Sequence, residues 1–111
     1  MPAIFVLIPK VLVLIFLDVS QNIALKSLGC GNNQLTTLDI SINTVLEDLW
    51  CGSNQLVSLD VTNNPSLYIL GLRDMPTLKE VCVWTMPFPP EGVWVEKDGS
   101  PNVYFTTECN K

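Results

Sequence analysis

The sequence predicts an all-β repeat protein of stacked coils, and three observations carry this prediction. Units that begin with leucine alternate between a longer and a shorter form from residue 14 onward, so the pattern that starts at Leu14 starts again at Leu35 and at Leu56. The fourth and sixth residues of each unit are apolar and flank one outward residue, which is the alternation of a short strand with one buried face. The ninth residue is asparagine in five of six units. Such repeats form solenoids, because a single repeat cannot bury its apolar face alone.

The recurrent asparagines are expected to be structural. An asparagine at a fixed place after each strand can bind the backbone groups that a turn leaves unpaired. Stacking of the coils would then arrange these amides in a ladder. The ladder consists of Asn22, Asn33, Asn43, Asn54 and Asn64.

Residues 14–77 resemble the leucine-rich repeat proteins, specifically the short bacterial subclass whose repeat nests LxxLxLxxNx and LxxLDLxxNxx halves. The resemblance implies a leucine-rich repeat parallel β-solenoid, here of about three coils, with a surface used for binding. Met75 stands where asparagine is expected, and the unit 67–77 is one residue longer than its counterparts. The repeat therefore loosens near its end, and we assign 14–81 to the repeats.

Residues 82–111 are expected to form a C-terminal cap. Three prolines in WTMPFPPEG (84–92) exclude a regular ladder there. The segment 92–107 then predicts a β-hairpin of two alternating strands joined through Asp98-Gly99. This tail is also similar to the cap that follows the same bacterial repeat subclass. The aromatic residues available to cover the last coil are Trp84, Phe88, Trp94, Tyr104 and Phe105.

The apolar segment 1–13 has more than one interpretation. When this part of the sequence is aligned with the next repeat, leucine positions coincide with Ile4, Leu7 and Leu14. This alignment favours a degenerate first coil. A poor export signal and an artefact of a truncated reading frame are the alternatives. The apolar run is short of the roughly 20 residues that a membrane-spanning helix needs. Its apolar outward positions would suit upstream repeats or self-association through residues 1–17.

The four cysteines fall into two pairs. Cys30 and Cys51 share a buried position one coil apart that Leu72 takes in the next coil, so we expect a stacked pair of free thiols there. Cys82 is outward and Cys109 lies at the far end of the cap, where a disulfide between them would close the cap onto the last strand. Such a bond requires an oxidising compartment, hence an extracellular or periplasmic location.

The composition argues against several classes of function. The chain has 111 residues, with 6 Lys and Arg against 11 Asp and Glu, a net charge of -5 and no histidine. An acidic chain without a basic stripe disfavours nucleic acid and anionic membranes as partners. The absence of histidine removes Ser-His and Cys-His nucleophile pairs. The acid pairs Glu47 with Asp48 and Glu96 with Asp98 are not expected to converge in a pocket. We therefore expect no enzyme, no cofactor and no metal.

Two ladders of outward residues are candidate binding surfaces. Asp18, Asp39 and Asp60 form the first, which fits a solvated acidic stripe better than a weak calcium site. Trp50 belongs to the second, between Gly29 and Gly71. It is a plausible anchor for a protein or a sugar ring, although it could instead pack over neighbouring turns. The residues on the same face are Lys26, Glu47, Asp48 and Tyr68.

These observations predict a non-catalytic binding module that is secreted or displayed on the cell surface. Its partner is expected to be a protein, with a glycan as the second choice, bound by the outward residues of the stacked strands. The alternative is a structural fragment that caps a longer repeat array and has no ligand of its own. A cytoplasmic interaction protein is a third interpretation, and it requires four reduced cysteines.

Overall fold

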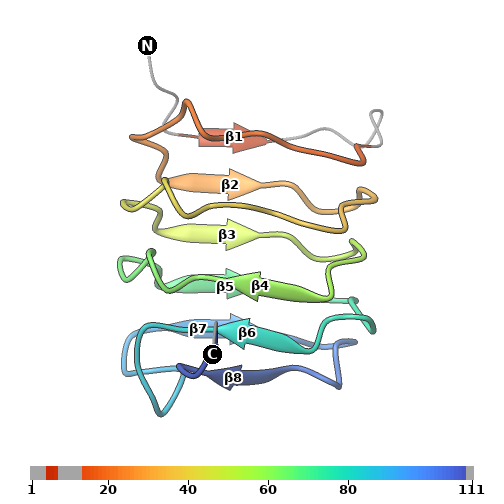
Figure 1. Ribbon diagram of the computed structural model, residues 1–111, viewed down its shortest axis with the longest axis vertical. Helices are drawn as coiled ribbons and strands as arrows, with labels where there is room; N and C mark the ends of the chain where they lie inside the picture. Colours follow the sequence, from red (N-terminus) through yellow and green to blue (C-terminus); the bar gives the residue numbers. More distant parts are fainter. Residues whose placement is uncertain (1–4, 8–13, 110–111) are drawn as a thin grey trace.

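The computed structural model describes residues 5–7 and 14–109, and this part of the chain contains strands and turns but no helix (Figure 1). Accordingly, none of the described residues belongs to a helix that could cross a membrane. The described residues form eight strands of three residues each. Their bounds are β1 Phe5–Leu7, β2 Ser27–Gly29, β3 Asp48–Trp50, β4 Ser58–Asp60, β5 Ile69–Gly71, β6 Glu80–Cys82, β7 Trp94–Glu96 and β8 Tyr104–Thr106.

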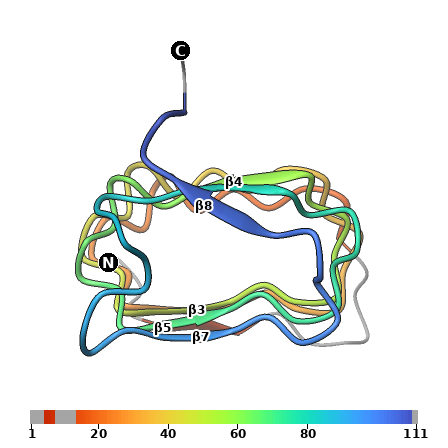
Figure 2. The same cartoon turned by 90° about the horizontal axis from the view of Figure 1, so that it is seen from below.

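The strands form two parallel sheets on opposite long sides of a flattened coil (Figure 2). The five-stranded A sheet has the order β1-β2-β3-β5-β7, and the three-stranded B sheet has the order β4-β6-β8. Every pairing joins strands of successive coils in parallel, so the chain winds as a parallel β-solenoid of about four turns. The predicted all-β solenoid is confirmed, with about four turns where the sequence suggested about three.

The repeat period sets the register of the A sheet. Leu28, Leu49 and Leu70 hold the same position in successive repeats, stand opposite one another in β2, β3 and β5, and are all fully buried. Because side chains alternate along a strand, the residues on either side of each leucine turn outward. In β2, β3 and β5 the middle residue therefore builds the core, and its two neighbours lie on the outer side of the sheet.

The turns that follow β2, β3, β5 and β7 have the same backbone corner. Three positions after the ends of β2, β3 and β5, a non-glycine residue takes a positive φ, namely 62° at Asn32, 56° at Ser53 and 57° at Asp74. Gly99 stands at the same place after β7, with a φ of 80°. Asparagine, aspartate and glycine tolerate this left-handed conformation better than other residues.

The C-terminal β-hairpin predicted from the sequence is wrong. β7 pairs in parallel with β5 and β8 pairs in parallel with β6, so the two strands lie in opposite sheets and extend the solenoid. The Asp98-Gly99 step makes the corner between the sheets instead of a tight hairpin turn. An Asp-Gly pair sets only the local φ values, whereas burial of Val95 and Phe105 against the core determines where the strands go.

Three aromatic residues close the C-terminal end of the core. The rings of Trp84 and Phe88 meet edge to face with centroids 5.3 Å apart, and Phe88 contacts Phe105 at 4.9 Å. All three are partly buried against the core. Trp94 and Tyr104, which were also expected to cover the last coil, are each 53% exposed. They lie on the outer faces of β7 and β8.

The start of the chain joins the A sheet in a different register from the one that its sequence suggested. β1 pairs with β2 so that Val6 stands opposite Leu28, whereas a constant repeat period would place Leu7 there. Strand register is fixed by alternation between apolar and polar residues, which this apolar segment lacks. Leu14, by contrast, keeps the repeat period. Its carbonyl accepts a hydrogen bond from the Gln34 amide, and one repeat later the carbonyl of Leu35 accepts the equivalent bond from the Gln55 amide. Most of the segment 1–13, and with it the choice between a degenerate coil and an export signal, lies outside the described residues.

Candidate functional site

Two of the recurrent asparagines form hydrogen bonds through both Nδ2 and Oδ1 of their side chains. Nδ2 of Asn54 donates to the carbonyls of Cys51 at 2.9 Å and Cys30 at 3.1 Å, and Oδ1 accepts from the Leu35 amide at 3.0 Å. Asn33 binds the Leu14 amide and the Cys30 carbonyl in the same way. These side chains tie each coil to the one before it, so their place in the molecule is structural.

The other asparagine column binds only through Nδ2. Asn43 donates to the carbonyls of Val19 and Asn22, and Asn64 donates to those of Ile40 and Asn43. Within the described part of the chain, Oδ1 of Asn43 and Oδ1 of Asn64 are buried without a hydrogen-bond partner. The two columns therefore differ in their hydrogen bonds: Asn33 and Asn54 bind through Nδ2 and Oδ1, whereas Asn43 and Asn64 bind through Nδ2 alone.

Ser100 replaces an asparagine in the last coil, a role that the sequence did not reveal. Its hydroxyl accepts from the Met75 amide at 2.8 Å and donates to the Leu72 carbonyl at 2.5 Å. Met75 holds the repeat position that Asn33 and Asn54 hold in earlier coils. It is fully buried and packs in the apolar core.

The aspartate ladder binds its own turns. The carboxylates of Asp18, Asp39 and Asp60 accept from backbone amides two residues further on, at 2.9–3.0 Å. Hydrogen bonds from the hydroxyl and amide of Ser41 hold the pKa of Asp39 below its ordinary value, and Ser20 does the same for the pKa of Asp18. This geometry fits a turn-stabilising stripe, in which one oxygen of each carboxylate binds its own turn.

The free cysteines lie in the core. Cys30 and Cys51 are fully buried and not disulfide-bonded. Burial raises the pKa of Cys30 to about 12, and burial together with the neighbouring Cys30 raises the pKa of Cys51 well above its ordinary value. Protonated thiols are poor nucleophiles and poor metal ligands, so this pair acts as apolar filling.

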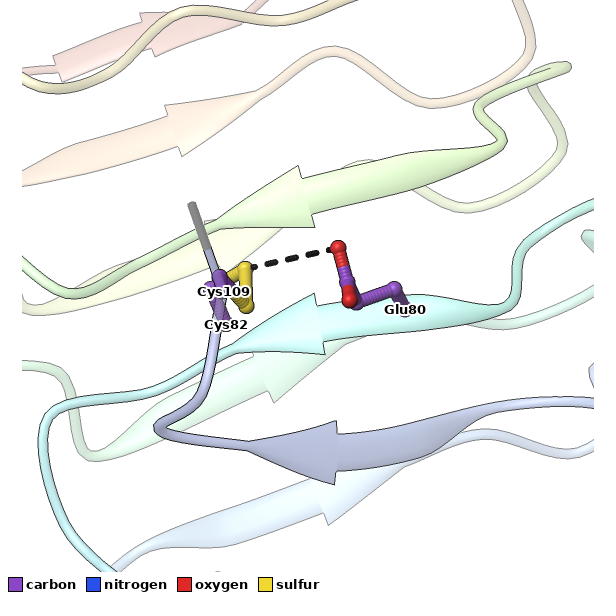
Figure 3. Close-up of side chains that lie close together, drawn as sticks. All are labelled: Glu80, Cys82 and Cys109. Atoms are coloured by element: carbon purple, nitrogen blue, oxygen red, sulfur yellow. Dashed lines mark hydrogen bonds between the residues drawn. A yellow bond between two sulfur atoms is a disulfide. The ribbon is translucent and has the colours of Figure 1, made fainter. Parts of the chain in front are cut away.

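The disulfide predicted between Cys82 and Cys109 is present (Figure 3). The bond joins residues whose Cα atoms are 5.9 Å apart and which are separated by 27 positions in the chain. Cys82 occupies the column of Asp60 in the B sheet, and the Glu80 carboxylate lies 3.8 Å from its sulfur. The three side chains include metal-ligating types, but sulfurs bonded to each other are not thiolates, so the oxidised cluster is not a metal site.

The outward face of the A sheet brings together two exposed tryptophans. The six-membered ring of Trp50 lies against Gly71 of the next coil, where a Cβ atom would overlap the ring. The centroids of Trp50 and Trp94 are 6.0 Å apart and their planes are inclined by 57°. The two residues are 42% and 53% exposed. Trp50 therefore both packs on the neighbouring coil and presents its indole to solvent.

A groove of about 420 Å³ runs beside this tryptophan pair. Two charged residues of opposite sign line it, Arg73 and Glu96. The Arg73 guanidinium is 4.0 Å from the carboxylate of Asp98, and Glu96 accepts from the Asp98 amide at 2.8 Å. The complete lining is Gly31, Asn32, Trp50, Gly52, Ser53, Gly71, Arg73, Trp94 and Glu96.

The remaining candidates on this face lie at the beginnings of its strands. Lys26 and Glu47 form an exposed ion pair at 3.7 Å, and Asp48 accepts from the Ser27 hydroxyl at 2.5 Å. Tyr68 is 48% exposed, and its carbonyl accepts from the Trp94 amide at 2.8 Å. None of these four residues lines the groove, so they form its surroundings.

Sequence reasoning missed Trp94, Arg73 and Glu96 as members of the site. The sequence places Trp94 in the cap, within the hairpin expected over 92–107. A constant repeat period would also put Pro90 opposite Ile69 in β5, where Trp94 stands instead. The signal that could have found it is the alternation of Trp94, Val95 and Glu96, which matches the outward-inward-outward pattern of the earlier A-sheet strands.

Comparisons of the chain with protein-family models, with curated proteins and with solved structures found no match.

Proposed function

We propose that this chain is a non-catalytic binding module that recognises its partner through the outward face of the A sheet. The observation that carries the proposal is the pair of exposed tryptophans, Trp50 and Trp94, held beside a groove on a rigid sheet. Large aromatic side chains dominate the energetics of binding surfaces. The proposal assigns the chain no enzymatic activity and no cofactor.

The sheet suits recognition because its surface is already ordered. Both tryptophans belong to strands whose backbones are paired with the neighbouring coil, and Trp50 is further held by Gly71. A surface that is fixed before binding loses little conformational entropy when a partner docks. The ion pair of Lys26 and Glu47 supplies a polar rim at one side of the face.

We also propose that the chain is a leucine-rich repeat protein of the short bacterial subclass, and that it is secreted or displayed on the cell surface. The leucine columns in register across the coils and the asparagines bound to corner carbonyls support the family assignment. The disulfide of Cys82 and Cys109 is compatible with an extracellular location, since such bonds persist in oxidising compartments.

The structural alternative, a cap without a ligand of its own, has one observation in its favour. The aromatic cluster of Trp84, Phe88 and Phe105 closes the C-terminal end of the core. A cap needs this closure but has no use for exposed tryptophans on the side of the solenoid. The two functions therefore differ in what happens when Trp50 and Trp94 are removed.

The test compares three immobilised proteins in their oxidised form: the wild type, the double variant Trp50→Ala/Trp94→Ala, and Tyr104→Ala. Tyr104 is as exposed as Trp94 but lies on the B sheet, which makes it a matched control. Each protein is exposed to the same extracellular mixture of proteins and polysaccharides. We expect the wild type and Tyr104→Ala to retain the same component and the double variant to lose it. Equal retention by all three proteins would exclude this face, and no retention by any would favour the structural cap.

A further inference from the structure

We infer that the groove beside Trp50 and Trp94 binds a saccharide, so that the partner of this module is a glycan. The inference rests on the proposed function and names its ligand class. The sequence alone placed a protein first, and the chemistry of the groove lining reverses that order.

The apolar part of the groove suits the face of a sugar ring. A pyranose exposes C–H groups on its faces and hydroxyl groups around its edge, so it stacks on a flat aromatic side chain. Trp50 and Trp94 provide two such indoles, inclined by 57° and both about half exposed. Because Gly71 has no side chain, the Trp50 ring rests on the backbone beneath it and is held in place without being covered.

The polar part of the groove suits the hydroxyl edge of a sugar. Each hydroxyl can both donate and accept, and the lining offers both functions. The Arg73 guanidinium donates and the Glu96 carboxylate accepts, while Asn32 and Ser53 can do either. Glu96 uses Oε1 for the Asp98 amide, and Arg73 meets Asp98 only at 4.0 Å, an exposed pair that rearranges at little cost.

Other ligand chemistries fit this lining less well. An apolar protein side chain would dehydrate Arg73 and Glu96 without giving either a partner. A cationic group would face the Arg73 guanidinium, and an anionic group would face Glu96. A neutral polyhydroxyl ligand satisfies both charged residues and both indoles together.

The size of the groove is also appropriate. Its volume of about 420 Å³ lies within the range of roughly 300–1,000 Å³ typical of small-ligand sites. The groove is open to solvent and lies on the side of the solenoid, so an oligosaccharide can extend beyond it across the neighbouring coils.

The experiment titrates the oxidised protein with a panel of soluble neutral, acidic and amino-sugar oligosaccharides. Tryptophan fluorescence and calorimetry report binding. We expect saturable binding of at least one neutral oligosaccharide. Trp50→Ala should lower its affinity by about tenfold to thirtyfold, as expected for a residue that anchors a binding site. Tyr104→Ala should leave the affinity unchanged.

Gly71→Ala is a second variant that keeps both indoles but places a methyl group where the Trp50 ring lies. It should weaken saccharide binding although no ligand-contacting side chain is removed. Urea unfolding of each variant confirms that it is folded before titration.

The outcomes separate this inference from the proposed function. If no oligosaccharide of the panel binds while the wild type retains a protein that Trp50→Ala/Trp94→Ala loses, the saccharide inference is wrong and the binding module stands. The inference is also wrong if a saccharide binds to Trp50→Ala with the same affinity as to the wild type. If neither a saccharide nor a protein depends on the two tryptophans, both proposals fail.

Discussion

Replacement of Asn54 by leucine should destabilise the solenoid far more than the same replacement of Asn64. Both side chains are buried, at 5% and 0% exposure, and both stand at the ninth position of their units. The extra volume of leucine therefore strains the two sites to a similar extent. What differs is the set of backbone groups that each amide serves.

At Asn54 the substitution leaves buried backbone groups without their partners. The Leu35 amide loses Oδ1 and the Cys51 carbonyl loses Nδ2. A buried polar group left unsatisfied costs about 1–3 kcal/mol, so two of them cost about 2–6 kcal/mol. The free energy of unfolding of a domain is only about 5–15 kcal/mol, which makes this loss large.

At Asn64 the carbonyls that lose Nδ2 keep another donor. The Ile40 carbonyl still accepts from the Asn43 amide at 3.1 Å, and the Asn43 carbonyl still accepts from the Leu46 amide at 3.2 Å. The substitution also removes Oδ1 of Asn64, which is buried without a partner in the described structure. The hydrogen-bond cost at this site is therefore about 1 kcal/mol or less.

Urea unfolding of the oxidised proteins, followed by circular dichroism, measures both values. We expect Asn54→Leu to lose at least about 2 kcal/mol more than Asn64→Leu, with equal dependence of the free energy on urea concentration. Equal losses would refute the argument, because they would show that the difference between the two asparagine columns has no energetic consequence.

Three further predictions concern the cysteines and the acidic stripe. Cys109→Ser opens a loop of 27 positions and should lower the free energy of unfolding by about 3.5 kcal/mol in the chain-entropy model, as measured in urea; an unchanged midpoint would contradict this. Because burial raises their pKa, the thiols of Cys30 and Cys51 should stay protonated at pH 8 and react with a thiol reagent only when the protein unfolds. Rapid labelling of the folded protein would show that the core opens. The carboxyl pKa of Asp39 is lowered in the folded state, so its contribution to stability is present above about pH 4 and is lost as the pH falls through the folded pKa. Ser41→Ala should raise that pKa toward its ordinary value in an NMR titration, and an unmoved pKa would disprove the assignment of Ser41 as the cause.

The central coils could be predicted because their order in space follows a constant period in the sequence. The shift that places Leu28 opposite Leu49 also places Leu49 opposite Leu70, and no long-range information is needed beyond that shift. The pairing of Cys82 with Cys109 was also predictable, because only these two cysteines stood outside the buried columns.

The last coil could not be predicted in the same way. The longer segment between β6 and β7 breaks the constant period, so Trp94 no longer aligns with Ile69 when the sequence is shifted by one repeat. The hairpin predicted at Gly99 was wrong for a different reason. A positive φ serves both a hairpin turn and a solenoid corner, and only burial of the flanking strands distinguishes the two.

The position of Trp50 illustrates a choice that the sequence left open. Packing over a neighbouring turn and exposure to solvent were opposing interpretations. The ring instead packs on Gly71 in the neighbouring strand β5, which has no side chain, and it stays 42% exposed. Whether an outward tryptophan packs or projects depends on the residue that occupies the same column one coil further on.

The contact between Trp50 and Gly71 restricts the order in which this surface can evolve. Most outward positions of the A sheet can change independently, since surface substitutions usually alter stability by no more than about 0.5 kcal/mol. Position 71 cannot, because any side chain there overlaps the indole of the preceding coil. A smaller residue at position 50 removes this overlap, so the two positions form an epistatic pair in which the cost of a side chain at position 71 depends on the residue at position 50.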